Sequence, residues 1–171
     1  MNFTSGDSCE SLASGDALHF LIYILNYRQE KESKSKEAKV KIEHRIPTTA
    51  EYAKLRTAAG WQKTDDAATR TALNNSLFCA VAVDSGNVVG LGRVTGDGGL
   101  YFYIQDLLVL PEYRHRGVGT SLMTELMRFI TDNAAPGTFV GLMAAKGLRD
   151  YYVRFGFKSR PHDAPGMFRI I

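Results

Sequence analysis

The stretch from Asp106 to Leu122 constrains the fold more than any other part of the chain. An apolar segment that reaches Leu110 is followed by Pro111, a basic loop with two glycines, and a run with the apolar period of a helix. A strand that leads through such a loop into a helix aims free N–H groups and the positive end of the helix dipole beyond the strand. This order predicts a site for a phosphorylated ligand.

The residue types in the loop fit the same prediction. Gly117 and Gly119 let the main chain approach a phosphate without an intervening side chain, and Arg114 and Arg116 add charge and donors. His115 lies in the same loop, where we expect a solvated rather than a catalytic imidazole. An ordinary turn between a strand and a helix is the alternative interpretation of the glycines.

Charge disfavours a nucleic-acid partner. The chain has 171 residues and a formal net charge of +3, a size that suits one domain with a short extension. The excess of basic residues falls within residues 28–45, and the remainder is balanced. No basic face is therefore predicted for the folded body.

The first 39 residues are predicted to form an extension that is partly disordered. Residues 1–16 are rich in Ser, Gly and Asp, and residues 28–39 read as a solvated helix or linker. The apolar run Ala17–Tyr27 is too short to cross a bilayer and lacks signal-peptide flanks. Cys9 and Cys79 fit no metal or disulfide spacing, which favours a reducing, cytoplasmic compartment.

From residue 40 onward, the pattern predicts a mixed α/β domain in the order β-α-α-β-β-β-α-β-α-β. Three antiparallel strands form a meander, and a β-α-β crossover then places a buried strand parallel to the last of them. The expected strands are 40–46, 77–83, 88–95, 100–110, 138–144 and a final 167–171, and the expected helices are 48–59, 65–75, 118–133 and 148–155. The phosphate loop then lies at the carboxyl end of a strand, where ligands bind in α/β units.

Two motifs resemble those of the GCN5-related N-acetyltransferase (GNAT) superfamily. Val109-Leu110-Pro111 followed by Arg-His-Arg-Gly-Val-Gly at 114–119 is similar to its acyl-CoA motif, and Tyr-Tyr-Val-Arg-Phe-Gly-Phe at 151–157 is similar to its second signature. The resemblance covers residues 40–171. It implies the GNAT-like acyl-CoA N-acyltransferase fold: a central mixed, mostly antiparallel, splayed sheet flanked by helices.

The resemblance also implies acetyl-CoA as co-substrate. Amides of residues 115–120 would bind the pyrophosphate, and the Thr120 hydroxyl would add a donor. The strand before the loop would bulge, so that its backbone pairs with the pantetheine arm. The implied cofactor-binding residues are Leu107, Leu108, Val109, Arg114, His115, Arg116, Gly117, Val118, Gly119 and Thr120.

Tyr152 falls where the family has its general acid, four residues before Gly156. A phenol can protonate the departing thiolate; packing on a short helix is the alternative. Asp106 is the candidate base, with anchoring of a neighbouring loop as the alternative. Its neighbour Gln105 cannot take a proton, and strand alternation predicts that one of the two faces the substrate. Trp61 could wall the acceptor site, although core packing is the preferred interpretation.

The predicted function is transfer of acetyl from acetyl-CoA to a primary amine of a small molecule, by direct attack in a ternary complex. No cysteine is placed to form an acyl-enzyme, and no metal-ligand cluster is visible. The alternatives are a non-catalytic acyl-CoA-binding regulatory module and an acetyltransferase for protein lysines or N-termini. No membrane partner is expected, and the oligomeric state is open, a homodimer included.

Overall fold

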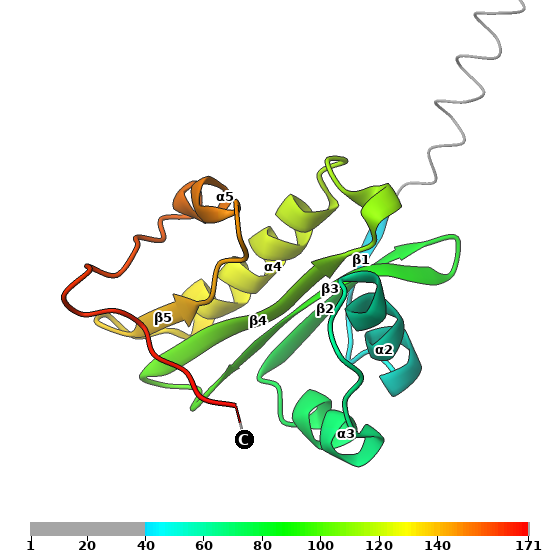
Figure 1. The fold of residues 1–171 in the computed structure, drawn as a ribbon, viewed down its shortest axis with the longest axis horizontal. Helices are drawn as coiled ribbons and strands as arrows, with labels where there is room; N and C mark the ends of the chain where they lie inside the picture. Colours follow the sequence, from blue (N-terminus) through cyan, green and yellow to red (C-terminus); the bar gives the residue numbers. More distant parts are fainter. Residues whose placement is uncertain (1–39, 171) are drawn as a thin grey trace, which may run out of the picture. The chain divides into compact units, whose positions relative to one another are not determined.

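The computed structural model describes residues 40–170, which contain a five-stranded mixed sheet (Figure 1). Neighbouring strands pair in chain order, antiparallel from β1 to β4 and parallel between β4 and β5. This is the predicted meander followed by a crossover. The strands are β1 (Lys41–His44), β2 (Phe78–Asp84), β3 (Asn87–Gly96), β4 (Tyr101–Val109) and β5 (Phe139–Leu142).

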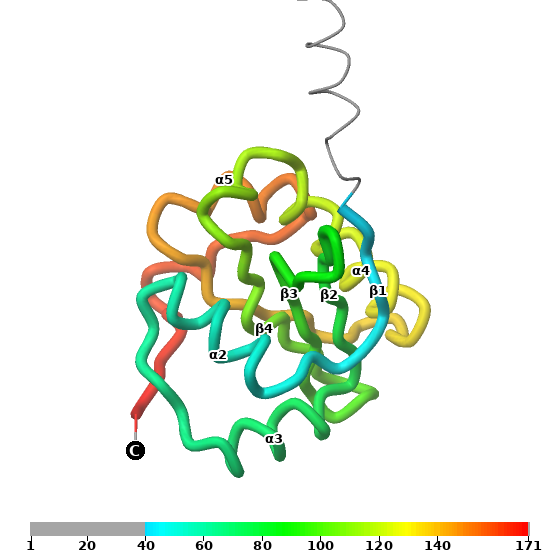
Figure 2. Tube along the Cα trace, turned by 90° about the vertical axis from the view of Figure 1, so that its right-hand side faces the viewer, coloured from blue at the N-terminus to red at the C-terminus, as the bar shows by residue number. Residues whose placement is uncertain are grey.

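Helices cover both faces of the sheet. Figures 1 and 2 show α2 and α3 on one face and α4 on the opposite face. A short 3-10 helix, which the sequence pattern did not indicate, leads from β4 into the phosphate loop. The helices are α2 (Thr49–Ala58), α3 (Asp66–Asn74), the 3-10 helix (Pro111–Tyr113), α4 (Val118–Asn133) and α5 (Arg149–Val153).

Side-chain caps fix the starts of α2 and α3, at the positions where the predicted helices 48–59 and 65–75 begin. Thr48 accepts from the Glu51 N–H at 3.2 Å, and the Glu51 carboxylate accepts from the Thr48 N–H at 2.7 Å, which completes a capping box. Asp65 accepts from the Ala68 N–H at 2.8 Å. These caps satisfy amides that the first helical turn leaves unpaired.

The apolar stripe of α4 forms the centre of the core on its side of the sheet. Its packing against β3 is close: a Cβ at Gly92 would lie 2.8 Å from Leu126 Cδ1, so a larger residue there would force the leucine side chain to shift. Met123 is fully buried within this stripe. The buried members of the stripe are Val118, Leu122, Met123, Leu126 and Ile130.

Strand β4 changes character at Asp106, which has a φ of +55° in the left-handed region. The register with β3 shifts across this point, between Leu91 and Arg93, as at a β-bulge. On its other side, β4 pairs with β5 only from Tyr101 to Ile104. The second half of β4 is therefore held by β3 alone among the described strands.

Two expectations for the end of the chain are wrong. The strand predicted at 138–144 is shorter and lies at the sheet edge, where Phe139 is 48% exposed, so it is not a buried strand. Residues 167–170 form no strand, and their apolar side chains are exposed. Apolar composition alone does not separate a buried strand from an exposed edge or tail. The predictions for residues 1–39 and for Ile171 lie outside the described residues.

Candidate active site

The loop between β4 and α4 carries the backbone geometry that an anion site requires. His115 and Gly117 have φ values of +60° and +82°, so the chain turns twice before α4 begins. The first backbone hydrogen bond of the helix runs from Ser121 N–H to Gly117 O at 2.9 Å. The N–H groups of residues 118–120 precede it and have no intrahelical acceptor. The loop projects at one end of the sheet (Figure 1).

Contacts within the loop fix its position. Arg114 Nε donates to Val109 O at 3.2 Å, and the Arg116 guanidinium lies 5.1 Å from the Tyr113 ring centroid. Tyr113 Oη in turn donates to Asp84 Oδ2 at 2.7 Å, which ties the loop to the β2–β3 turn. Neither loop arginine has a carboxylate within ion-pair distance in residues 40–170. Both charges are free to meet an anion.

The opening between β4 and β5 lies directly before this loop. Leu107 and Val109 face α4: Leu107 lies near the Gly92 site, and Val109 Cγ2 lies 3.8 Å from where a Cβ at Gly119 would stand. On the open side of β4, the residues after Ile104 have no strand partner in the described chain. The predicted cofactor-binding residues of β4 and of the loop are thus contiguous.

The Tyr151 hydroxyl lies beside this loop. Tyr151 Oη is 3.6 Å from the position of a Cβ at Gly119, and it is buried without a hydrogen-bond partner. Burial, with a contribution from Tyr152, raises the pKa of Tyr151 to about 12; the Thr120 hydroxyl and Arg154 act in the opposite direction. Tyr151 is the first residue of the motif at 151–157, and the motif alone assigns it no role.

Tyr152 lies deeper, with its ring in edge contact with that of Tyr151 at a centroid distance of 5.0 Å. It is 7% exposed and lines a hollow together with Met127 of α4 and residues 139–142 of β5. Burial raises the pKa of the Tyr152 phenol. Both tyrosines are therefore neutral at physiological pH.

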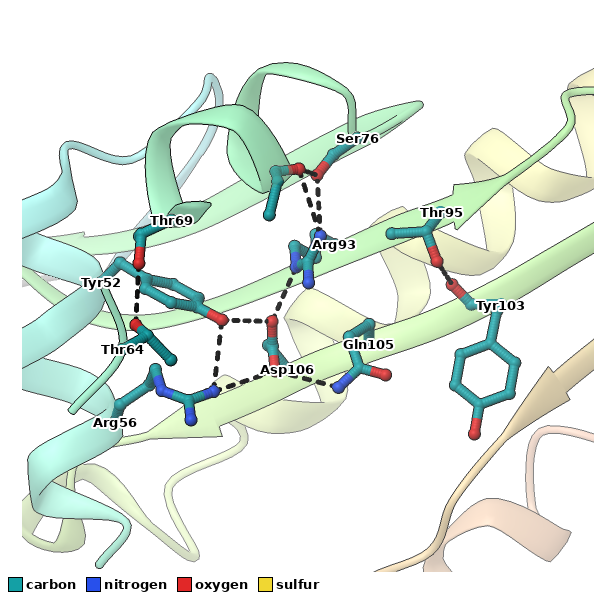
Figure 3. A network of polar contacts seen from close by, with 11 residues as sticks. Tyr52, Arg56, Thr64, Thr69, Ser76, Arg93, Thr95, Tyr103, Gln105 and Asp106 are labelled. Carbon is teal, nitrogen blue, oxygen red and sulfur yellow. Dashed lines mark hydrogen bonds and ion pairs between the residues drawn. The ribbon is translucent and has the colours of Figure 1, made fainter. Parts of the chain in front are cut away.

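Asp106 is the centre of a buried polar network on the α2 face of the sheet (Figure 3). Its carboxylate accepts from Arg93 Nε at 2.6 Å, Tyr52 Oη at 2.8 Å and Gln105 Nε2 at 3.1 Å, and Arg56 Nη1 lies 3.9 Å away. The Asp106 side chain is 1% exposed. Burial, more than the Asp106 charge, raises the pKa of Tyr52.

The bulge overturns one expectation from the sequence. Because Gln105 donates to Asp106, which also contacts Tyr52 of α2, these two consecutive side chains both lie on the α2 face. A regular strand would place them on opposite faces. Arg56, Arg93 and Tyr52 had no motif to mark them; only contacts across the fold assemble this network.

Trp61 does not pack in the core, and the prediction that it does is wrong. It is 39% exposed, and its ring lies 5.0 Å from the Arg56 guanidinium carbon at the end of α2. Cys79 is buried, and burial raises the pKa of its thiol. Within residues 40–170, no three His, Cys, Asp or Glu side chains are arranged to hold a metal ion. Every helix in that range is too short or too polar to cross a membrane.

Comparisons with known proteins agree with this geometry. The acetyltransferase (GNAT) domain family matches residues 35–165. GCN5-related N-acetyltransferase 2, chloroplastic, of Arabidopsis thaliana is 32% identical over 81 residues, which cover 47% of this chain and 31% of that protein. The chain thus spans about a third of the length of this relative. The uncharacterized N-acetyltransferase ycf52 of Porphyra purpurea is 26% identical over 122 residues, 69% of each chain.

Solved structures add the fold. A probable acetyltransferase of unknown function from meticillin-resistant Staphylococcus aureus is 34% identical, with a TM-score of 0.73 over 77% of this chain and 99% of that one. A GNAT family acetyltransferase from Streptococcus pneumoniae is 31% identical, with a TM-score of 0.63 over 77% and 98%. The sheet that opens between β4 and β5, the glycine loop before α4 and these matches together identify the chain as a member of the GNAT acetyltransferase family.

Proposed function

We propose that this protein transfers the acetyl group of acetyl-CoA to a primary amine of a small molecule. The observation that carries the proposal is the position of the α4 N-terminus, with Gly117 and Gly119, at the end of the β4 segment that β5 leaves unpaired. A diphosphate at the loop would meet free amides and two arginines that have no carboxylate partner in residues 40–170. The pantetheine arm would extend along β4 residues 107–109 as an added strand.

The reaction would proceed by direct attack within a ternary complex. The neutral amine forms a bond to the thioester carbonyl carbon, the carbon–sulfur bond breaks, and the thiolate of CoA takes a proton. Tyr152 is the proposed proton donor: its raised pKa keeps the phenol protonated until the thiolate forms. The amine gives up its proton to a base or to solvent.

The base is assigned less directly. Asp106 as a general base stays a prediction, and its contacts support the anchoring alternative: the carboxylate is buried and already accepts from an arginine and a tyrosine. With its oxygens engaged by these donors and its side chain 1% exposed, the carboxylate offers little access to an incoming amine. We favour a positioning role, in which Asp106 holds the bulge of β4.

Binding of acetyl-CoA is the first test. Gly119→Asp should weaken acetyl-CoA binding by about 100-fold or more, because a carboxylate would face the phosphates. Gly119→Ala should stay within about fivefold, since the added Cβ meets only ordinary contacts at 3.6 and 3.8 Å. Calorimetry with acetyl-CoA and with CoA measures both. Equal binding by the wild type and Gly119→Asp would remove the loop from the site.

Turnover is the second test, measured as release of free CoA thiol across a panel of amines. Tyr152→Phe should lower kcat by about 100-fold with little change in acetyl-CoA affinity, the effect expected for loss of a general acid. Tyr151→Phe is the comparison variant, because it removes the neighbouring hydroxyl, which lies beside the loop. A larger kcat loss in Tyr151→Phe would move the acid role to that residue.

The same assay separates the rival functions. A non-catalytic acyl-CoA-binding module would bind acetyl-CoA but release no thiol with any amine. An acetyltransferase for protein lysines or N-termini would act on peptides in preference to small amines.

A further inference from the structure

Positive charge exceeds negative charge in the buried network around Asp106. Two guanidinium groups, those of Arg56 and Arg93, share this one carboxylate, and no other carboxylate lies within 4.0 Å of either in residues 40–170. Arg93 holds Asp106 at 2.6 Å, so this pair is neutral as a unit. Arg56 brings a second positive charge, which is opposed by its more distant contact with the same carboxylate at 3.9 Å and by the partial negative charge at the end of α2.

The Arg56 guanidinium is poorly satisfied by its own protein. Its Nη1 donates to Tyr52 Oη at 3.3 Å and its Nη2 to Gln62 O at 3.2 Å, both long contacts to neutral acceptors. Its Nε is buried and has no partner. A guanidinium carries five N–H donors in a fork that matches carboxylate and phosphate oxygens. Unpaired buried donors of this kind raise the free energy of the folded state until an acceptor reaches them.

The surroundings of Arg56 are aromatic and partly open to solvent, unlike those of a packed core. Its side chain keeps 18% of its surface exposed. Trp61 and Tyr52 stack on the guanidinium at 5.0 and 5.5 Å, and Trp61 remains 39% exposed. An exposed aromatic ring beside a cation with free donors can flank a small organic anion.

The position of Arg56 relates this charge to the proposed reaction. It shares Asp106 with Gln105, the first residue of β4 beyond the segment that pairs with β5. Acetyl-CoA would enter through that opening, so a ligand group on Arg56 lies on the α2 face beside the reacting end of the pantetheine arm. Figure 3 shows Arg56 and Gln105 on either side of Asp106.

We infer that the acceptor is a small amine that also bears an anionic group, carboxylate or phosphate, which Arg56 binds with Trp61 as a flanking wall. This inference rests on the proposed acetyl transfer and narrows its substrate class. Arg56 would fix the anionic end of the acceptor and so direct the amine toward the thioester. Amines without an anion would leave the guanidinium unpaired and be disfavoured.

The test compares matched amines: β-alanine with propylamine for a carboxylate, and phosphoethanolamine with ethanolamine for a phosphate. In the wild type, kcat/KM should be about tenfold or more higher for the anionic member of at least one pair, and that pair identifies the anion. Arg56→Gln should remove this preference, with kcat/KM for the neutral members and the Kd for acetyl-CoA each changed less than about twofold. Arg56→Lys, which keeps the charge without the fork, should retain part of it.

Lys54→Gln is the matched control, because it removes one positive charge from an exposed site on the same helix. It should leave both members of each pair unchanged. Circular dichroism and melting temperature exclude misfolding of the Arg56 variants. The inference is overturned if the wild type uses the neutral members equally well, or if Arg56→Gln lowers both members alike.

The two proposals fail in different ways. Turnover of amines without a preference for an anion overturns the substrate class and leaves acetyl transfer intact. If no amine releases thiol, acetyl transfer is wrong, and calorimetry of β-alanine and phosphoethanolamine with CoA present decides the anion site. Binding that Arg56→Gln abolishes would support that site, and absence of binding would overturn it.

Discussion

Two arginine–carboxylate clusters meet helix α2, and they differ in charge balance and burial. Near its start, Arg45 contacts Glu51 through both terminal nitrogens at 2.8 and 2.9 Å and reaches Glu43 at 3.2 Å, with side chains 26% to 36% exposed. Near its end, Asp106 meets Arg93 and Arg56, with side chains 1% to 18% exposed. The first cluster has more acid than base, and the second has more base than acid.

The comparison separates attachment from recognition. In the first cluster, Arg45 is already paired with Glu43 and Glu51 of the same chain. These contacts join β1 to the cap of α2 in a solvated setting, where ion pairs contribute little to stability. In the second cluster, the charges are buried, so removal of one partner leaves the other as an uncompensated buried charge and destabilises the fold. An unpaired charge costs little free energy in water but much more in a protein interior, where a ligand of opposite charge would compensate it. We therefore attribute ligand binding to the second cluster only.

The largest effect is expected from Asp106→Asn, which leaves two buried guanidiniums without a carboxylate. Asparagine tolerates the positive φ of this position, so the change isolates the charge. The free energy of unfolding should fall by about 3 to 5 kcal/mol. Asp132→Asn, on the exposed side of α4, should change it by less than about 0.5 kcal/mol. Urea unfolding measures both variants. A change below about 0.5 kcal/mol for Asp106→Asn as well would contradict the claim that the buried cluster depends on its carboxylate more than the exposed one does.

A middle effect is expected from Tyr52→Phe. The change removes a donor to Asp106 at 2.8 Å and an acceptor for Arg56, and it keeps the ring in the core. A hydrogen bond to a charged group contributes about 1.5 to 3 kcal/mol, so unfolding should become easier by about 2 kcal/mol. Tyr101→Phe is the control, since that ring is exposed. Equal losses in the two variants would mean that the hydroxyl at Tyr52 is not part of the buried cluster's stability.

The smallest effect is expected from Glu51→Gln, which keeps the cap of α2 and removes the charge. Hydrogen bonds from Arg45, with the Thr48 amide contributing and burial opposing, lower the pKa of Glu51 from 4.5 to about 2. A lowered pKa in the folded state stabilises the protein above pH 4.5, and this contribution is lost as the pH falls toward 2.

Exposure and solvent screening limit that contribution to about 1 kcal/mol at pH 7. The unfolding free energies of the wild type and Glu51→Gln should therefore differ by about this amount at pH 7 and converge as the pH falls from 4.5 toward 2. A difference that stays constant between pH 7 and 2 would contradict an ionic origin.

Local sequence signals predicted most of the fold. The capping box at Thr48, the turn between β2 and β3, and the full extent of α4 follow from short-range chemistry that the sequence displays directly. Predictions weakened toward the end of the chain, where the 138–144 strand proved short and exposed. Whether an apolar strand is covered depends on neighbours far along the chain, which periodicity does not encode.

The site divides in the same way. The loop at 114–119 was predicted from its own residues, because glycine, arginine and a helix start are local features. The network of Asp106 with Tyr52, Arg56 and Arg93 could not be, since its members are up to 54 residues apart and meet only at a bulge. A bulge reverses strand alternation. The family resemblance implied a bulge in this strand, but no residue type marks the position at which it occurs.

The four-residue seam between β4 and β5 has a consequence for motion in solution. The β4–β5 pairing ends at Ile104 and Leu142, so we expect β5 and α5 to unfold locally without the rest of the domain. The meander of β1 to β4 should unfold only together with the whole domain. Amide protons of residues 139–142 should exchange with deuterium earlier than those of β2 and β3. A ligand bound between β4 and β5 would stabilise β5 against local unfolding, and its binding would be measurable as slower amide exchange of residues 139–142.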